Sequence, residues 1–212
     1  MNPRGLIVDL DGTLYRAGPV KVAMAAELVL FGLPVARLLR AFRAQHEHLR
    51  ADPTAPLGDP FSQQLARTAR LVGTEPAILE RVVRDWMVER PGKWLRLARR
   101  ADLLVALGRY RSAGGRTALV SDYPAREKLA ALGASHLFEV VVASGEPGGP
   151  QRLKPAPDGF LAAAASLSLA PAECLAIGDR DDADGEAARR AGMAFQHVDG
   201  AARLVAALCG AR

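Results

Sequence analysis

Short apolar runs alternate with amphipathic segments over the second half of the chain. The predicted strands cover residues 117–120, 138–142, 175–177 and 195–198, and the predicted helices cover residues 125–132, 157–167, 185–191 and 201–208. Strands and helices that alternate with short connections require a parallel sheet covered by helices on both faces. An apolar run at residues 6–8 predicts one more buried strand of the same sheet. The sequence therefore predicts an α/β protein.

A long helical block separates the first predicted strand from the others. From residue 21 to residue 100 the apolar side chains follow helical spacing, with few clusters of β-branched residues. Turn-forming residues at 52–60 predict a loop inside this block. We therefore expect a Rossmann-like, doubly wound parallel sheet core made of residues 1–14 and 101–212, with an inserted α-helical domain at residues 15–100.

The positive charge of the chain is concentrated in this insert. The 212 residues carry 28 Lys+Arg and 23 Asp+Glu, a formal net charge of +5, and 24 of the basic residues are Arg. Residues 15–100 have a net charge of +7, and the remainder has a net charge of −2. Codon preference in a GC-rich genome explains an excess of Arg, and so does a surface for phosphates, nucleic acid or acidic lipid. No nucleic-acid-binding motif accompanies the excess, so a nucleic-acid partner is not expected.

The cysteines and the apolar runs bear on the compartment. Cys174 and Cys209 lie far apart, without the spacing of a zinc site or a disulfide framework, as expected in a reducing cytosol. Asp9 and Asp11 interrupt the first apolar stretch, so no signal peptide is expected. The longest uncharged run, residues 159–172, is too short to cross a bilayer. We expect a cytoplasmic protein without a membrane span, as a monomer or a homodimer.

Two carboxylates follow the first predicted strand. Asp9 and Asp11 belong to the run Asp-Leu-Asp-Gly-Thr, directly after residues 6–8. Active sites of open α/β sheets lie at the carboxyl ends of the strands, and two carboxylates there can serve as nucleophile and general acid. A surface turn is the simpler alternative. A calcium loop is disfavoured, because a third ligand before the glycine and a distal Glu are missing.

Two later segments offer groups that bind phosphate. Ser121 follows a predicted strand, where a hydroxyl and the amides of a starting helix can hold a phosphoryl oxygen; an ordinary helix N-cap is the alternative. Asp122 either lends its backbone amide to the phosphate or only begins the helix. Lys154 precedes a helix that starts with proline and is one of only four Lys in the chain. A fixed charge that neutralises phosphate is one interpretation; a solvated surface lysine is the usual alternative, but the scarcity of Lys makes this residue harder to dismiss.

The densest group of acids follows the strand predicted at residues 175–177. Asp179, Asp181, Asp182 and Asp184 fall within six residues. Acids are common at a helix N-terminus, but four like charges repel one another unless a cation compensates them. Mg²⁺ prefers oxygen ligands and takes one or two carboxylates together with water and phosphate. The segment therefore predicts a magnesium site.

In this order and at these strand ends, the four segments resemble the haloacid dehalogenase superfamily, in its phosphatase branch with a helical cap. Asp9 and Asp11 match the DxDGT motif, Ser121 the Ser/Thr motif, Lys154 the Lys motif, and Asp179 and Asp184 the GDxxxxD motif. The insert stands between the first two motifs, where the family carries its cap. Dehalogenases lack the second aspartate of the first motif and phosphonatases have Ala there, so Asp11 favours a phosphatase.

The resemblance implies a Mg²⁺-dependent phosphatase that hydrolyses a small phosphomonoester through a phosphoaspartate. It makes Asp9 the nucleophile and Asp11 the general acid and base. Because Asp11 must donate a proton, its pKa is expected to lie above that of Asp9. The implied Mg²⁺ ligands are the Asp9 carboxylate, the Asp11 backbone carbonyl and Asp179, with Asp184 acting through water and Asp182 as an alternative to Asp184. Ser121, Asp122 and Lys154 are expected to hold the phosphate.

Other functions use the same residues. A phosphomutase or phosphotransferase would pass the phosphoryl group to an acceptor, and a regulatory module would bind phosphate without turnover. The module is disfavoured by the intact set of Asp9, Asp11, Ser121, Lys154 and Asp179. His46 and His48 are two residues apart and do not share a helical face, so no histidine is expected in the site. The expected partner is a small phosphorylated metabolite, whose identity the helical insert would determine.

Overall fold

The computed structural model describes residues 3–52 and 57–210 and contains a five-stranded parallel sheet. The strands are β1 (Gly5–Asp9), β2 (Arg116–Ser121), β3 (Val140–Ala143), β4 (Cys174–Gly178) and β5 (Ala194–His197). Their order across the sheet is β3-β2-β1-β4-β5, and each neighbouring pair is parallel. From the central β1 the chain builds one half of the sheet and then the other, which is the doubly wound arrangement. The predicted Rossmann-like α/β fold is confirmed.

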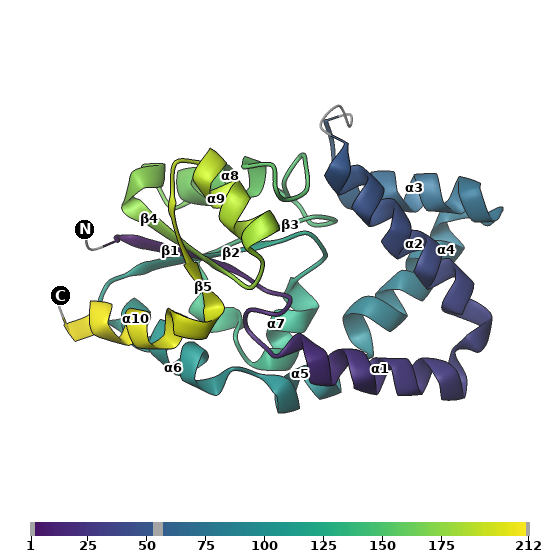
Figure 1. The fold of residues 1–212 in the computed structure, drawn as a ribbon, viewed down its shortest axis with the longest axis horizontal. Coiled ribbons are helices and arrows are strands. Elements are labelled where there is room, and N and C mark those ends of the chain that lie inside the picture. Colours follow the sequence, from purple (N-terminus) through teal and green to yellow (C-terminus); the bar gives the residue numbers. More distant parts are fainter. Residues whose placement is uncertain (1–2, 53–56, 211–212) are drawn as a thin grey trace.

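Helices cover both faces of the sheet (Figure 1). One face carries α6 (Ala101–Ser112), α7 (Arg126–Leu132) and α10 (Val198–Gly210), and the other carries α8 (Asp158–Ser166) and α9 (Glu186–Arg190). Successive side chains of a strand point to opposite faces. Leu6 and Val8 therefore join the first hydrophobic cluster, whereas Ile7 joins the second. Because β1 is buried on both sides, its sequence is a continuous apolar run.

The residues between β1 and α6 form a helical layer beside the sheet (Figure 1). Its elements are α1 (Ala17–Phe31), α2 (Leu33–Ala51), α3 (Pro60–Val72), α4 (Pro76–Arg84), a π-helical turn (Asp85–Glu89) and α5 (Gly92–Ala98). Phe42, Leu79 and Val83 belong to a hydrophobic cluster of this layer. We call the layer the cap. The loop predicted at residues 52–60 includes residues 53–56, which lie outside the described part of the chain.

The chain leaves and re-enters the core at neighbouring positions. Tyr15 and Arg99 form an antiparallel bridge. The amide of Arg16 donates to the carbonyl of Ala98 at 2.8 Å, and the amide of Arg100 donates to the carbonyl of Leu14 at 2.9 Å. We propose that these paired linkers are the boundary between a core of residues 1–14 and 101–212 and a cap of residues 15–100.

Several predicted elements begin at other residues in the structure, and the helix expected at residues 201–208 starts three residues earlier, at Val198. The strand expected at residues 138–142 starts at Val140, because Ser135–Leu137 forms a 3-10 turn. The carbonyl of Leu137 in this turn accepts from the Thr117 hydroxyl, and the amide of Phe138 donates to the carbonyl of Ser135 within the turn at 3.4 Å. The helix expected at residues 185–191 is preceded by a π-helical turn, Asp181–Gly185. Asp184 closes that turn by accepting from the amide of Arg180 at 3.1 Å.

Within the described residues, no helix combines the length and the apolar character needed to cross a membrane.

Candidate active site

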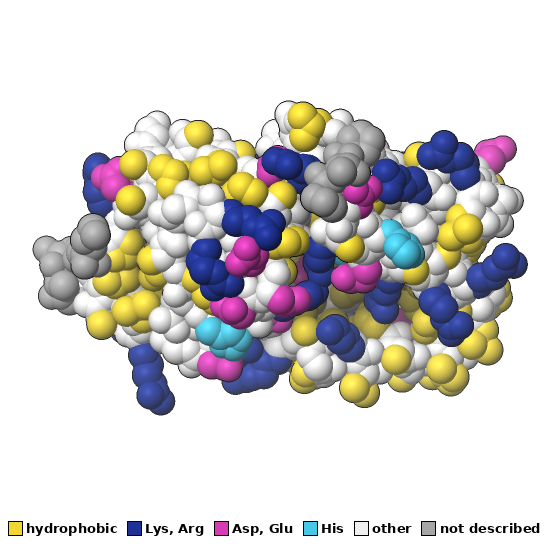
Figure 2. All heavy atoms as spheres, turned by 45° about the horizontal axis from the view of Figure 1, so that its top comes forward, with side chains coloured by type: hydrophobic (Ala, Val, Ile, Leu, Met, Phe, Trp, Pro, Cys, Tyr) yellow, Lys and Arg dark blue, Asp and Glu magenta, His cyan; other side chains and the backbone are white. Residues whose placement is uncertain are grey.

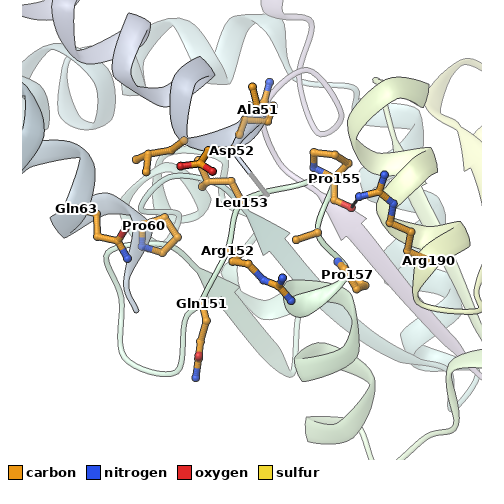
Figure 3. A pocket seen from close by; sticks show the side chains of 13 residues that line it. Ala51, Asp52, Pro60, Gln63, Gln151, Arg152, Leu153, Pro155, Pro157 and Arg190 are labelled. Carbon is orange, nitrogen blue, oxygen red and sulfur yellow. Dashed lines mark hydrogen bonds between the residues drawn. The ribbon is translucent and has the colours of Figure 1, made fainter. Parts of the chain in front are cut away.

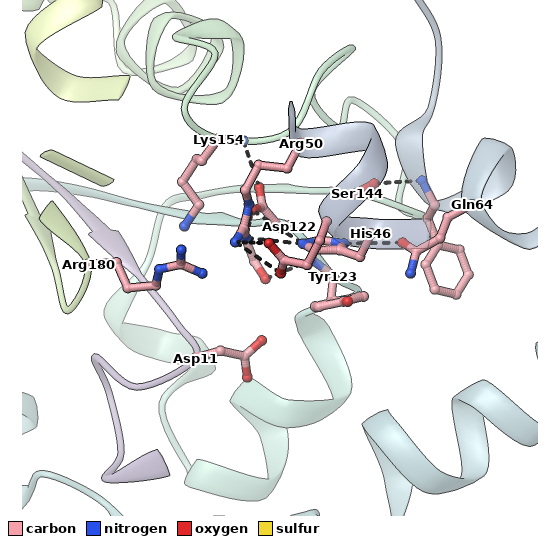
Figure 4. A network of polar contacts seen from close by, with 12 residues as sticks. Asp11, His46, Arg50, Gln64, Asp122, Tyr123, Ser144, Lys154 and Arg180 are labelled. Carbon is pink, nitrogen blue, oxygen red and sulfur yellow. Dashed lines mark hydrogen bonds and ion pairs between the residues drawn. The ribbon is translucent and has the colours of Figure 1, made fainter. Parts of the chain in front are cut away.

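The carboxyl ends of β2, β1 and β4 bring the predicted residues together. Asp9 ends β1 and pairs in register with Val120 of β2, next to Ser121. Val8 pairs with Ile177 of β4, two residues before Asp179. Figure 4 shows Asp11, Asp122 and Lys154 around a common space, which Arg50 enters from the cap. Residues far apart in the sequence thus meet at the edge of the sheet where ligands of such folds bind.

Gly12 makes the turn after β1 possible. Its φ of 96° lies in the left-handed region, which favours glycine. A Cβ atom at this position would lie only 2.0 Å from Oδ2 of Asp179. The Asp-Gly pair is therefore required here for a close approach between the loop after β1 and the acid after β4, and not only for a surface turn.

Three of the predicted acids form a cluster that suits a cation. Carboxylate oxygens of Asp9, Asp179 and Asp184 lie within 4.8 Å of one another. Oδ2 of Asp9 is buried and has no hydrogen-bond partner among the described residues. A buried, unpaired carboxylate oxygen beside two further acids provides the hard oxygen ligands that Mg²⁺ prefers. The cluster therefore fits the metal that the family resemblance implies.

Lys154 lies against two of these acids. Its buried Nζ donates to Oδ1 of Asp9 and, at 2.7 Å, to Oδ1 of Asp184. Burial raises the pKa of Asp9 and the charge of Asp184 raises it further, while Lys154 opposes both. Burial alone would lower the pKa of Lys154, but Asp184 and Asp9 outweigh it and raise this pKa. Lys154 is thus a fixed positive charge in the site.

Asp11 is held by partners outside the acid cluster. Nζ of Lys128 donates to its two carboxylate oxygens at 2.7 and 2.9 Å, and the Tyr15 hydroxyl donates to Oδ1. Burial by itself raises the pKa of Asp11, but Lys128 and Tyr15 outweigh it and lower the pKa. The expectation that the pKa of Asp11 lies above that of Asp9 is contradicted, because burial and Asp184 raise the pKa of Asp9 while a buried ammonium group lowers the pKa of Asp11.

The sequence analysis did not predict Lys128. This lysine lies on α7, is buried, and faces the Tyr123 ring with Nζ 5.9 Å from the ring centre. One signal was available, since the scarcity of lysine that singled out Lys154 applies equally to Lys128. Its partner Asp11 could not be read from the sequence, because the two residues are 117 positions apart.

Ser121 and Asp122 occupy the end of β2. Ser121 is buried, and its hydroxyl accepts from the amide of Tyr123 at 3.2 Å. The Asp122 carboxylate accepts from the amide of Lys154 at 3.1 Å and so ties β2 to the loop before α8. The sequence analysis considered only the backbone of Asp122, whereas the structure shows that its side chain is also engaged.

Two cap residues reach the core at this point. Nη2 of Arg50 donates to Oδ2 of Asp122 at 3.0 Å, and Nε of Arg50 is buried without a partner among the described residues. The His46 ring stacks on Tyr123 with 4.5 Å between ring centres, and Nε2 of His46 lies 3.9 Å from Oδ2 of Asp122. The sequence analysis gave no histidine a role, and the structure places His46 beside Asp122 because α2 carries His46 and Arg50, four residues apart, on one helical face.

The acids after β4 divide into two groups. Asp184 is buried, whereas the Asp182 side chain is 70% exposed. The Asp182 carboxylate pairs with Arg180 at 2.5 Å. Asp181 is exposed to the same degree and pairs with Arg189. Of the two alternatives for the second acid of this motif, Asp184 lies in the cluster with Asp9, and Asp182 faces solvent.

A cavity of about 350 Å³ lies where the end of α2 meets the loop before α8 (Figure 3). The cap contributes Arg50 and Gln63 to its lining, and the core contributes Leu153 and Pro155, the neighbours of Lys154. Arg190 reaches the carbonyl of Pro155 at 3.4 Å. The cavity has the size of a small-molecule site and borders the loop that carries Lys154.

A family model described as haloacid dehalogenase-like hydrolase matches residues 3–192. The chain belongs to this family. It is 29% identical over 203 residues to the fructose-1-phosphate phosphatase YqaB of Escherichia coli K12, covering 89% of this chain and 93% of that protein. It is also 46% identical to a glyceraldehyde 3-phosphate phosphatase of Methanopyrus kandleri over 67 residues, 32% of this chain and 28% of that protein.

Solved structures of the family share the fold. The L-2-haloacid dehalogenase of Xanthobacter autotrophicus superimposes with a TM-score of 0.61 at 19% identity, covering 91% of this chain and 76% of that one. At this identity the likeness concerns the fold alone. The predictions of a haloacid dehalogenase-like family member and of a hydrolase are confirmed, and the predicted phosphatase branch agrees with both curated relatives, which are named as phosphatases.

Proposed function

We propose that this haloacid dehalogenase-like hydrolase is a Mg²⁺-dependent phosphatase that cleaves a small phosphomonoester through a covalent phosphoaspartate on Asp9. The observation that carries the proposal is the buried Asp9 carboxylate. One of its oxygens accepts from Lys154 and the other has no partner among the described residues. A carboxylate held in this way at the end of a central strand is oriented for attack on a bound phosphorus atom.

In the first half of the proposed reaction, an oxygen of Asp9 forms a bond to phosphorus while the bond from phosphorus to the ester oxygen breaks. Asp11 donates its proton to the departing alkoxide. Lys128 favours the ionised form of Asp11 before substrate binds. A phosphate anion arriving beside Asp11 acts in the opposite direction and raises its pKa. Substrate binding itself therefore promotes the protonated form that this step needs.

In the second half, Asp11 is left as a carboxylate and accepts a proton from water. The oxygen of that water bonds to phosphorus, and the bond between Asp9 and phosphorus breaks to release inorganic phosphate. Lys128 favours this second step, because its contact with the Asp11 carboxylate keeps that carboxylate in one orientation. Throughout the cycle, Lys154, Ser121 and the backbone amide of Asp122 are the groups proposed to neutralise and hold the phosphoryl oxygens.

Mg²⁺ is proposed to bind the Asp9 carboxylate, the Asp11 backbone carbonyl and Asp179, with Asp184 supporting it through water. When bound, the ion supplies the positive charge that reduces repulsion between an anionic nucleophile and an anionic phosphate. The clustering of three acids supports this assignment, since the single charge of Lys154 does not balance them.

The proposed substrate is a small phosphorylated metabolite of the sugar phosphate class. Both curated relatives are named as phosphatases of such compounds, and a cavity large enough for a small molecule borders the loop that carries Lys154. We propose that the cap selects the substrate, with Arg50 at the point where it reaches the core. A cytoplasmic location, and the choice between monomer and homodimer, stay predictions.

The proposal is tested with a panel of sugar phosphates and related metabolites, by measuring inorganic phosphate with and without Mg²⁺. We expect Mg²⁺-dependent release by the wild-type protein and none by Asp9→Asn, while Asp182→Asn, a change at an exposed acid, retains activity. An isomerised product without phosphate release would identify a phosphomutase instead. Full activity of Asp9→Asn would exclude Asp9 as the nucleophile.

A further inference from the structure

The outward side of α1 is apolar. Five large side chains on α1 and at the start of α2 each expose between 64% and 73% of their surface: Val22, Val29, Leu30, Phe31 and Leu33. We call this set the α1 face. Figure 1 shows α1 along the outer edge of the cap, and in Figure 2 hydrophobic atoms gather along that edge beside Lys and Arg side chains.

The charge pattern of α1 is the reverse of that of an ordinary surface helix. Its one acid, Glu27, is buried and faces α5, where it accepts from Nε1 of Trp94 at 2.6 Å and pairs with Nζ of Lys93 at 2.8 Å. A surface helix usually buries its apolar side and exposes its charges. Here the carboxylate faces α5, while Val22 and Val29, which are seven residues apart and lie on the opposite side of the helix, are exposed. Large apolar side chains that stay exposed near one another can mark an interaction site.

The surroundings of the α1 face are cationic. Within residues 15–46 the only acid is Glu27, and the basic residues are Arg16, Lys21, Arg37, Arg40 and Arg43. The helix α5, which packs beside α1, adds Lys93 and Arg96 and has no acid. Lys21 and Arg37 are both exposed and stand near opposite ends of the face. The surface thus combines apolar side chains with positive charges and offers no exposed carboxylate over this stretch.

We propose that the α1 face docks the protein onto an anionic phospholipid surface. The apolar side chains would enter the boundary between headgroups and acyl chains, and Lys21 and Arg37 would reach lipid phosphates on either side. A second copy of the chain is a poorer partner, because it brings the same cations and no acid to pair with them. This inference goes beyond the proposed phosphatase reaction and uses none of its residues.

The test is co-sedimentation of the whole protein with unilamellar vesicles. One set contains equal amounts of phosphatidylglycerol and phosphatidylcholine, and the other contains phosphatidylcholine alone. The apolar variant carries Val29→Ser, Leu30→Ser and Phe31→Ser together, and the charge variant carries Lys21→Glu and Arg37→Glu. A matched control carries three substitutions at exposed apolar positions outside the face, Leu71→Ser, Val105→Ser and Leu161→Ser. Thermal unfolding verifies that each variant is folded, independently of any enzymatic activity.

We expect the wild type to sediment with the anionic vesicles. The affinity of the apolar variant should fall by at least about a hundredfold, and that of the charge variant by about tenfold. The control should bind like the wild type. The proposal is overturned if the wild type stays in the supernatant, binds both vesicle sets equally, or loses nothing in the apolar variant. It is also overturned if sedimentation velocity shows that the wild type is a dimer and the apolar variant a monomer.

Discussion

The ammonium group of Lys128 contacts both carboxylate oxygens of Asp11, at 2.7 and 2.9 Å. The lysine comes from α7, and the aspartate comes from the turn after β1. Tyr15, on the linker to the cap, donates to the same carboxylate. The proposed general acid is therefore positioned jointly by the core and by the connection to the cap. This arrangement links the stability of the site to its acid–base chemistry.

Replacing Lys128 by methionine should lower both stability and activity. The variant leaves the partly buried Asp11 carboxylate without its main partner, and we expect the free energy of unfolding to fall by about 2 kcal/mol. The kcat should fall by about tenfold or more, since a general acid must be held in place. Urea unfolding and initial rates measure the two effects. Lys21→Met, a change at an exposed lysine, is the control and should leave both unchanged.

The two acids that the sequence left as alternatives should differ in metal affinity. Asp184→Asn changes the cluster with Asp9 and Asp179, and we expect it to weaken Mg²⁺ binding by about tenfold to a hundredfold. Asp182→Asn changes an exposed side chain and should leave the affinity within about twofold. Titration calorimetry with Mg²⁺ measures both variants. Equal losses in the two would contradict the assignment of Asp184 to the metal site.

Asp122 should contribute a pH-dependent part of the stability. Burial by itself raises the pKa of this carboxyl, but Lys154, His46 and Arg50 outweigh it and hold the pKa below its ordinary value. A lowered folded-state pKa stabilises the protein above the unfolded-state pKa of about 3.9, and the gain disappears as the pH falls through the folded-state pKa.

The comparison of wild type with Asp122→Asn tests this linkage. Above about pH 5 the wild type should be more stable by a constant amount of about 1–2 kcal/mol. Below about pH 4 the difference should shrink as the wild-type carboxyl takes up a proton. Urea unfolding across this range provides the free energies. If the difference in the free energy of unfolding stays constant down to the acid transition, the charge of Asp122 does not stabilise the protein.

Arg50 should act mainly on substrate binding. It is a cap residue that reaches a core carboxylate, and its buried Nε has no partner among the described residues. We expect Arg50→Ala to raise KM by about tenfold and to change kcat by less than about threefold, the signature of a binding contact away from the reacting atoms. Arg40→Ala, at an exposed position on the same helix, is the control. A larger effect on kcat than on KM would contradict this role.

The sequence predicted the core because local signals and topology agree there. The apolar run of β1, the acids after it and the alternation of strands and helices each depend on neighbouring residues, and the parallel topology then brings the strand ends together. Asp9, Ser121, Lys154 and Asp179 were predictable for this reason. Lys128, His46 and Arg50 were not, because each acts through a partner from another element. The pKa order of Asp9 and Asp11 was predicted wrongly because it depends on the burial of Asp9 beside Asp184 and on the contact of Asp11 with Lys128.

The bridge between Tyr15 and Arg99 has a consequence for how the core folds. The folded cap connects its two ends over a short distance, as a tight turn does, because these ends meet at adjacent, hydrogen-bonded residues. Once the cap helices have packed, joining β1 to α6 therefore costs the chain entropy of a short connection and not that of a long loop. Helices can be added to or removed from the cap without changing the distance that the core must close.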